Sequence, residues 1–370
     1  MKNALASKSC FPSPSKHRDV ATCSVVPRFM SSRSLWVDYA KGIGIVLVVY
    51  GHVARGVHSA GLPINESAFR LVDVVIYSFH MPLFFFLSGV FFLSSMQKHG
   101  VRGTLAVKLR TVAWPYFVWS LLQGLVEVQL ARLTNGAVIP ADVAALLWQP
   151  RAQFWFLYTL FFLSVIALLV YRWLSVRWQP AVPVLACMVY LYADSLPGGI
   201  LVSFVTQYVP YFACGVLFGR MEENAGRLRL GVVAAAAVVV AVMAQSIYHA
   251  PLSFAPDVRW PSLALALASI VAVVASCLWL AYWRLNWLAA LGRASLAIYL
   301  MHILAGSGTR IVMQKMLGIE SAVIHLMVGT VCGLLMPLIA QHLIQKLGVE
   351  SWFGLDGPAS PQATTATPRL

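Results

Sequence analysis

The chain consists mainly of apolar segments of about 20 residues, separated by short polar connections. A helix of that length crosses the ~30 Å hydrocarbon core of a bilayer, where every backbone polar group must be hydrogen-bonded within the protein. With 59% apolar residues, 11% charged residues and a mean hydropathy of +0.76, the composition excludes a soluble globular protein. The alternating segments of about ten residues that are typical of membrane β-barrels are not found. We therefore predict an all-α fold, a polytopic transmembrane helical bundle.

The hydropathy pattern predicts about ten spans. The fifth span is short and contains Pro183, so a tilted or re-entrant segment is the alternative there. The predicted spans cover residues 36–57, 70–94, 111–131, 154–172, 181–194, 203–219, 230–248, 260–282, 295–315 and 321–346.

The distribution of basic residues predicts the orientation. If the N-terminus is cytoplasmic, nineteen of the 27 Lys and Arg residues fall on the cytoplasmic side and seven on the other. The positive-inside rule then places both termini in the cytoplasm and requires an even number of spans. The net charge of +14 comes from connections between spans and from the tails, not from a soluble basic domain, so we expect no nucleic-acid partner.

Three regions follow from the composition. Residues 1–33 are rich in Ser, Pro and basic residues and are predicted to be a disordered cytoplasmic tail, with a transit peptide as the alternative interpretation. Residues 34–346 form the transmembrane domain, and residues 347–370 are predicted to be a C-terminal cytoplasmic tail. The six cysteines form no C-x-x-C pair, so neither a metal site nor a disulfide framework is expected.

The first span, W-V-D-Y-A-K-G-I-G-I-V-L-V-V-Y-G-H, carries three polar residues, Asp38, Lys41 and His52. Eleven residues separate Lys41 from His52, which is three helical turns plus ~20°, so both side chains point the same way and lie ~16 Å apart along the axis. Asp38 lies one turn before Lys41 on the same stripe and is close enough to pair with it. In the alternative interpretation these charges have no functional role. The Lys41 side chain only extends to the membrane surface, and Asp38 neutralises its charge.

The second span places His80 among aromatic and aliphatic residues in Y-S-F-H-M-P-L-F-F-F-L-S-G. Asp73 lies seven residues earlier on nearly the same face, so it can orient the His80 imidazole through an intervening group. Because consecutive antiparallel spans are usually neighbours, His52 and His80 indicate proton handling. A histidine that only bonds a neighbouring helix is the alternative for His80.

Further candidates lie before and within the later spans. Lys108 and Arg110 precede the third span and can bind phosphates or simply set the topology, and Trp114 can stack on a flat heterocycle. Trp155 belongs to F-W-F-L-Y, and His302 ends L-G-R-A-S-L-A-I-Y-L-M-H. His302 either lines the same cavity as His52 or serves only in helix packing.

These five motifs, in this order, resemble the acyltransferase-3 family of bacterial membrane proteins, and the resemblance extends from about Trp36 to Gln345. The chain is most similar to the acetyltransferases that modify exopolysaccharides, including those of xanthan type, and to the fucose O-acetylase branch. The family has a basic residue and a histidine eleven positions apart in its first span. They correspond here to Lys41, where many members have Arg, and to His52. The family's basic cluster before the third span corresponds in part to Lys108 and Arg110.

The resemblance implies an O-acyltransferase of the bacterial inner membrane, with cytoplasmic acetyl-CoA as donor and no permanently bound cofactor. The acceptor would be a sugar hydroxyl of an exopolysaccharide or its lipid-linked repeat unit, and membrane lipids and polysaccharide assembly machinery would be partners. His52 would act as general base or as an acyl-imidazole relay, and His80 would orient the acceptor or stabilise the oxyanion. The catalytic set is then His52, His80 and Asp38, and the substrate-binding set is Lys41, Lys108, Arg110, Trp114, Trp155 and His302.

Two other classes of function are weighed against this one. A proton-coupled secondary transporter or exporter of a polysaccharide or acyl precursor would use Asp38, Lys41 and the histidines as a proton relay. The halves of the sequence show no convincing internal repeat that would support it. A membrane sensor would require a soluble output domain, and the sequence shows none.

Overall fold

A computed structural model of the chain describes residues 35–130, 138–220, 227–249 and 259–355. The predicted tail at 1–33 and most of the predicted tail at 347–370 lie outside these residues. All regular secondary structure in the described ranges is helical, which confirms the all-α prediction. The α-helices are α1 (Leu35–Ser59), α2 (Glu66–Val90), α3 (Phe92–Lys108), α4 (Trp114–Gln129), α5 (Pro140–Ala144), α6 (Trp155–Trp173), α7 (Val182–Leu191), α8 (Ile200–Phe218), α9 (Arg227–Tyr248), α10 (Trp260–Leu280), α11 (Asn286–Arg293), α12 (Ser295–Ile311) and α13 (Ala322–Lys346).

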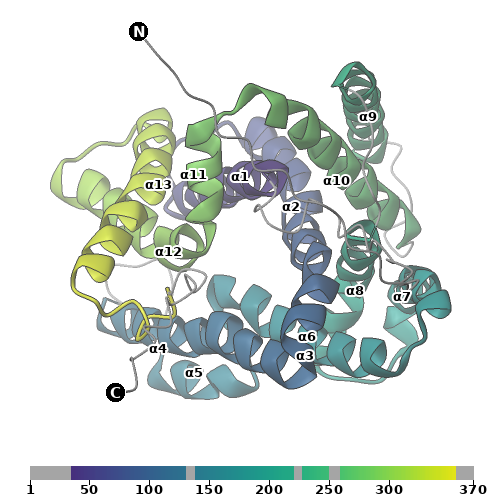
Figure 1. The fold of residues 1–370 in the computed structure, drawn as a ribbon. Coiled ribbons are helices and arrows are strands. Elements are labelled where there is room, and N and C mark those ends of the chain that lie inside the picture. Colours follow the sequence, from purple (N-terminus) through teal and green to yellow (C-terminus); the bar gives the residue numbers. More distant parts are fainter. Residues whose placement is uncertain (1–34, 131–137, 221–226, 250–258, 356–370) are drawn as a thin grey trace, which may run out of the picture. The chain divides into compact units, whose positions relative to one another are not determined.

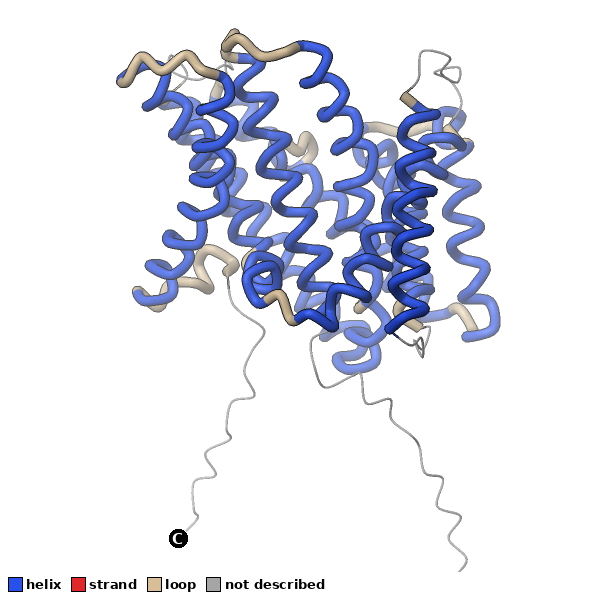
Figure 2. Tube along the Cα trace, turned by 90° about the horizontal axis from the view of Figure 1, so that it is seen from above, coloured by secondary structure: helices blue, strands red, loops and turns tan. Residues whose placement is uncertain are grey.

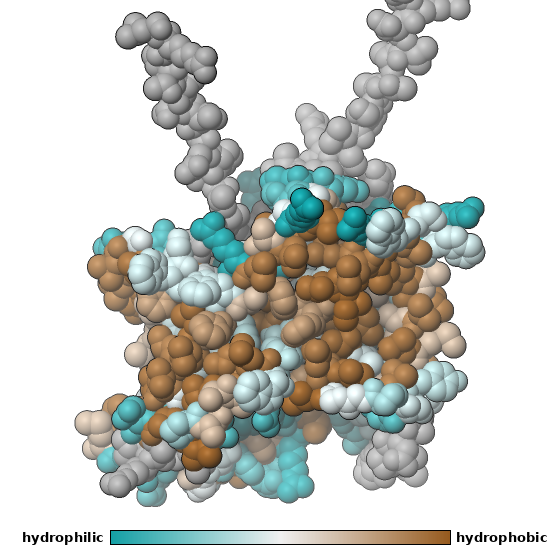
Figure 3. Space-filling view, turned by 90° about the horizontal axis from the view of Figure 1, so that it is seen from below, coloured by the Kyte–Doolittle hydropathy of each residue, from teal (hydrophilic) through white to brown (hydrophobic). Residues whose placement is uncertain are grey.

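Eight helical stretches of the described residues are long and apolar enough to cross a membrane. The long helices run side by side, with loops gathered at their two ends (Figure 2). Hydrophobic residues form a broad band between hydrophilic edges on the face shown in Figure 3. This pattern is the one expected of helices surrounded by lipid. The chain is therefore a membrane protein with several transmembrane helices.

Two of the ten predicted spans correspond to helices that are shorter than these eight. The third matches α4, which has 16 residues, and the fifth matches α7, which has ten. Arg220, just after α8, donates to Gln179, before α7, at 2.5 Å, and Arg259, before α10, forms an ion pair with Asp194, after α7. The segment from Gln179 to Asp194, which contains α7, thus has one end beside the C-terminus of α8 and the other end beside the N-terminus of α10. The count of ten spans stays a prediction.

Helix α1 packs against five other helices, α2, α10, α11, α12 and α13, and Figure 1 shows it between α11 and α2. Glycines permit this close packing. A Cβ atom added to Gly42 would lie 2.5 Å from the carbonyl oxygen of Leu288 in α11, and one added to Gly51 would lie 3.1 Å from the Tyr77 ring in α2. Such close approach at glycines is common in the packing of membrane helices.

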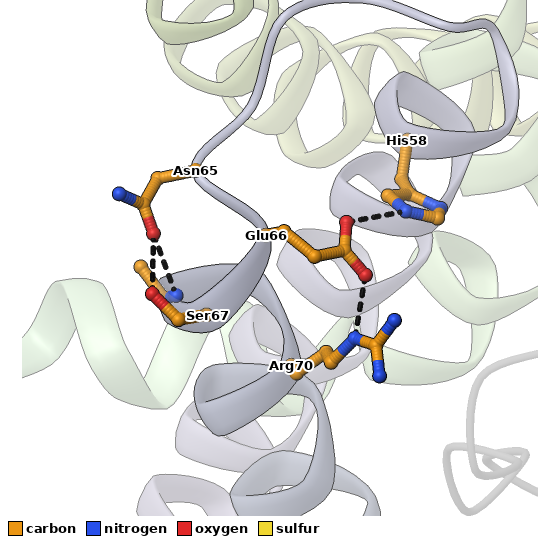
Figure 4. A network of polar contacts seen from close by, with 6 residues as sticks. His58, Asn65, Glu66, Ser67 and Arg70 are labelled. Atoms are coloured by element: carbon orange, nitrogen blue, oxygen red, sulfur yellow. Dashed lines mark hydrogen bonds and ion pairs between the residues drawn. The ribbon is translucent and has the colours of Figure 1, made fainter.

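The turn between α1 and α2 is held by a polar network (Figure 4). Asn65 caps α2, and its side-chain oxygen accepts from a backbone amide of the first turn at 2.9 Å and from Ser67 at 2.8 Å. Glu66 bridges His58 at 2.9 Å and Arg70 at 2.5 Å. These side chains are exposed, so each pair contributes little to stability, but together they fix how α2 follows α1.

Helices α1 and α12 run in the same direction. Asp38, in the first turn of α1, lies 3.8 Å from Arg293, just before α12. Near the other end, a Cβ atom added to Gly56 would lie 3.9 Å from Nε of Arg310. The polar residues of the second halves of both helices therefore lie at one end of the bundle.

Helices α2 and α8 approach so closely that their backbones touch. A Cβ atom at Gly89 would overlap the carbonyl oxygen of Phe212, and one at Gly215 would overlap that of Phe86. Only glycine fits at these positions without moving a helix, because the neighbour is backbone and cannot rotate away.

We expect Gly215→Ala to lower the free energy of unfolding by about 1 to 3 kcal/mol, the usual cost of overpacking a close contact. Gly308→Ala in α12 is the matched control, because an added Cβ there meets no atom within 4 Å and alanine favours helix. Thermal unfolding midpoints in detergent measure both effects. Equal midpoints for the two variants would contradict the close packing of α2 on α8.

Candidate functional site

A pocket lies between the second halves of α1 and α12 and the first turn of α13. About 320 Å³ of space lies within it and at its mouth, which is open to the outside. Glycine and aliphatic residues form much of its wall. Its polar lining residues are His52, His302, Ser307, Arg310 and His325.

His52 and His302 face each other in this pocket. Their ring centroids are 5.1 Å apart and their planes are tilted by 56°. Nδ1 of His302 lies 2.8 Å from the carbonyl oxygen of Tyr299, and because a carbonyl can only accept, Nδ1 carries the proton. Nε2 of His302 is therefore the acceptor nitrogen, and it is buried without a partner among the described residues. His302 thus lines the same pocket as His52, and its role in substrate binding stays a prediction.

His80 lies beside this pocket without lining it. Its side chain is buried, and Nδ1 donates to the carbonyl oxygen of Ile76 at 2.7 Å. The centroids of its ring and the Tyr77 ring are 4.6 Å apart, and the two rings are nearly perpendicular. Asp73 does not reach His80 directly. It binds Arg55 through two hydrogen bonds of 2.6 and 2.8 Å, and that guanidinium lies 3.2 Å above the Tyr77 ring, so Arg55 and Tyr77 are the intervening groups.

The first half of α1 carries Asp38 and Lys41. Asp38 is 3% exposed and lies 3.8 Å from Nη1 of Arg293. Its backbone leaves no room for a side chain at Gly292, so α1 and α11 are in close contact here. Asp38 therefore faces α11 at the opposite end of α1 from His52.

Lys41 interacts electrostatically with Lys108, the last residue of α3. Gly100, with φ at +66°, breaks the helical path of α3 and redirects its second half. Burial lowers the pKa of Lys108 to about 8, and the charge of Lys41 contributes to the same shift. Lys108 forms no ion pair with any residue that the structure describes. Arg110, in the π-helical turn that follows, is exposed.

Trp114 contacts the segment that follows α13. Its indole N–H lies 3.1 Å from the carbonyl oxygens of Ser351 and Trp352, and the indole of Trp119 donates to Phe353 at 2.9 Å. The first residues of the predicted C-terminal tail thus pack against α4. A heterocycle can stack only on the part of Trp114 that remains exposed.

Trp155 packs in an aromatic cluster between α6 and α8. Its ring stacks on Phe204 at 5.3 Å and lies 5.1 Å from Tyr208. It does not line the pocket of His52. A role in substrate binding stays a prediction for Trp155.

Three polar residues of the pocket, Ser307, Arg310 and His325, were not among the candidates from the sequence. Arg310 is 8% exposed and His325 is 1% exposed. His302, Gly306 and Arg310 are spaced by four residues, which places them on one face of α12, so this spacing is a signal that could have indicated Arg310. His325 is a single histidine in the last predicted span, and its sequence context carries no comparable signal. No group of His, Cys, Asp or Glu within the described ranges has the arrangement of a metal site.

Comparison with known proteins gives one match. A family model described as an acyltransferase domain covers residues 34–341. Searches of curated proteins and of solved structures found no match.

The lowered pKa of Lys108 predicts a pH-dependent stability. The unfolded chain, with an ordinary lysine pKa of 10.5, binds more protons than the folded protein between pH 8 and 10.5, so wild-type stability rises across this window. We expect Lys108→Met to raise the thermal unfolding midpoint at pH 7 and this advantage to shrink towards pH 10. Lys98→Met, at an exposed lysine of the same helix, is the control. A Lys108→Met advantage that is independent of pH would contradict the assignment.

Proposed function

Because the chain belongs to the acyltransferase-3 family, we propose that it is a membrane O-acyltransferase that moves an acetyl group from acetyl-CoA to a sugar hydroxyl. The acceptor is an exopolysaccharide or its lipid-linked repeat unit, as in the xanthan-type and fucose O-acetylase members that the sequence resembles. The observation that carries this proposal is the pair of imidazoles, His52 and His302, in one pocket with an unpartnered ring nitrogen.

In the proposed reaction, His52 is the general base. It takes the proton from the acceptor hydroxyl while the hydroxyl oxygen attacks the thioester carbonyl carbon. The tetrahedral intermediate then collapses, the carbon–sulfur bond breaks, and the CoA thiolate takes the proton back from the His52 imidazolium. The products are the sugar ester and free CoA, and His52 returns to its neutral form. An acyl-imidazole relay through the same residue is the alternative that the experiment below separates.

The neighbouring histidines have supporting roles in this proposal. Nε2 of His302 can accept a hydrogen bond from an acceptor hydroxyl, because its Nδ1 is held by backbone carbonyls. His80 is held in the same way by Ile76, so its Nε2 is also an acceptor when the ring is neutral. Because His80 lies beside the pocket, its proposed role is to orient the acceptor through an intervening group. An oxyanion-stabilising role would require a protonated His80.

The donor is proposed to bind at the other end of α1. Lys41, Lys108 and Arg110 would meet the CoA phosphates, which suit cationic side chains. The ~16 Å between Lys41 and His52 along the helix is comparable to the length of a pantetheine arm. The thioester of a donor bound in this way would reach His52 from the side opposite the acceptor.

This arrangement fits a bacterial inner-membrane enzyme with ten spans and both termini in the cytoplasm. Acetyl-CoA is cytoplasmic, so the Lys41 end of α1 would face the cytoplasm and the His52 pocket would face outward. Polysaccharide assembly machinery and membrane lipids are the proposed partners. No observation favours the alternative of a proton-coupled transporter.

We expect His52→Ala to reduce acetyl transfer at least 100-fold, the usual contribution of a general base. The measurement is transfer of label from acetyl-CoA to polysaccharide repeat units by purified protein. His58→Ala, on the same helix but at an exposed position outside the pocket, is the control and should retain activity.

Labelled acetyl-CoA without acceptor then separates the two mechanisms, because only the relay leaves acetyl groups on the protein. Retained turnover in folded His52→Ala would exclude both roles for this residue.

At the donor end, we expect Lys108→Met to raise the KM for acetyl-CoA about tenfold, which corresponds to the loss of one charged hydrogen bond, with little change in the acceptor KM. In the wild type this donor KM should rise as the pH passes 8, because Lys108 loses its proton in the free enzyme. The rise should be absent in Lys108→Met and present in Lys98→Met. If the donor KM is the same in Lys108→Met and in the wild type, the CoA phosphates do not bind at Lys108.

A further inference from the structure

Three buried polar atoms without a partner among the described residues belong to residues that line the same pocket. They are Nε2 of His302, Nε of Arg310 and Nδ1 of His325. Leaving a buried polar atom unpaired costs about 1 to 3 kcal/mol, so three in one pocket need an explanation. A ligand that pairs with all three provides it.

The chemistry of these three atoms differs. Nε of Arg310 can only donate, and its guanidinium is always charged. Nε2 of His325 lies 2.8 Å from the carbonyl oxygen of Ile319 and therefore carries the proton. Nδ1 of His325 and Nε2 of His302 are consequently acceptors in the neutral rings. The pocket thus offers one cationic donor and two neutral acceptors.

The charge of Arg310 is not compensated within the described protein. Nη1 of Arg310 lies 3.5 Å from the neutral side chain of Gln314, and no described carboxylate lies within 4 Å of the guanidinium. Arg55, at the same end of α1, is paired with Asp73 through two hydrogen bonds. A buried guanidinium without a counter-ion is strongly unfavourable unless an anion binds to it.

The pocket also fixes where such an anion would lie. Arg310 reaches Gly56, which is one helical turn, ~6 Å, beyond His52 along α1. His302 faces His52 itself. A ligand with its anionic group at Arg310 therefore brings a hydroxyl on the same small ring to the two facing imidazoles.

We propose that Arg310 binds an anionic group, a carboxylate or a phosphate, of the sugar that is acylated, while His302 and His325 accept hydrogen bonds from its hydroxyls. The acceptor is accordingly an acidic sugar unit. This inference rests on the proposed function for the identity of the ligand as acceptor, but the binding itself does not require acyl transfer.

The test measures binding of three probes to purified protein by calorimetry. They are methyl glucuronoside, methyl glucoside, which has the same ring without the carboxylate, and glucose 1-phosphate. At least one of the charged probes should bind about 10- to 100-fold more tightly than methyl glucoside, as expected for a charged hydrogen bond. Tighter binding of methyl glucuronoside indicates a carboxylate source, and tighter binding of glucose 1-phosphate indicates a phosphate.

In Arg310→Gln this preference should disappear, and in Arg310→Lys, which keeps the charge, it should be partly retained. Lys315→Gln removes an exposed charge five residues further along, outside the pocket, and should leave the preference unchanged. Equal binding of charged and neutral probes by the wild type, no binding of any probe, or an equal loss in Lys315→Gln would overturn the proposal.

Acetyl-transfer kinetics with the same probes separate this inference from the proposed function. Arg310→Gln should raise the KM of the preferred charged acceptor and leave the KM of acetyl-CoA unchanged. A loss of kcat that is equal for charged and neutral acceptors would show that Arg310 acts on the reacting atoms and would overturn the proposal. A charge preference in binding without any acetyl transfer would leave the anion site standing and remove the acyltransferase proposal.

Discussion

The hydrocarbon interior of a bilayer offers no hydrogen-bond partners, and this constraint governs where the polar side chains of the bundle lie. Most of them are paired inside the protein. Thr159 and Ser164 donate to backbone carbonyls one turn earlier in α6, and Gln123 of α4 and Gln153 bond each other through their amides at 2.8 Å. Of the nine buried side-chain atoms that lack a partner among the described residues, three line one pocket. The gathering of three such atoms at one place is the strongest structural sign of a binding site in this protein.

The same constraint explains why the unpaired charges that could bind ligands also destabilise the folded protein. Lys108 and Arg310 are cationic, partly or largely buried, and form no ion pair within the described chain. Burial without a counter-ion destabilises the folded protein, and the lowered pKa of Lys108 is a direct expression of that cost. In contrast, Arg55 and Asp73 satisfy each other and support the Tyr77 ring beside His80. An arginine in a membrane helix therefore indicates binding only when its carboxylate partner is missing, which the sequence alone does not show.

The sequence predicts the fold class and most of the spans because the thickness of the bilayer sets the length of the apolar segment that can cross it. It is less informative for α7, where a span-sized segment is divided between a short helix and flanking turns. The stripe on α1 also follows from sequence, since helical geometry fixes the relation of Lys41 to His52. Which helix faces that stripe does not follow, because it depends on glycine contacts between segments far apart in the chain. His302 was therefore an open question and Arg310 went unrecognised, although both lie on the face of α12 that meets α1.

The parallel course of α1 and α12 gives the proposed reaction its geometry. Both helices begin where Asp38 meets Arg293 and proceed together to the pocket of His52 and Arg310. Under the proposed function, the donor approaches along α1 from the cationic end, and the acceptor enters the pocket from the other end. Neither substrate then has to cross the bilayer, because only the acetyl group passes between them at His52. The close contact of α1 with α11 at Gly42 and Gly292 fixes the vertical position of α1. That contact therefore sets the level at which His52 lies along the bundle.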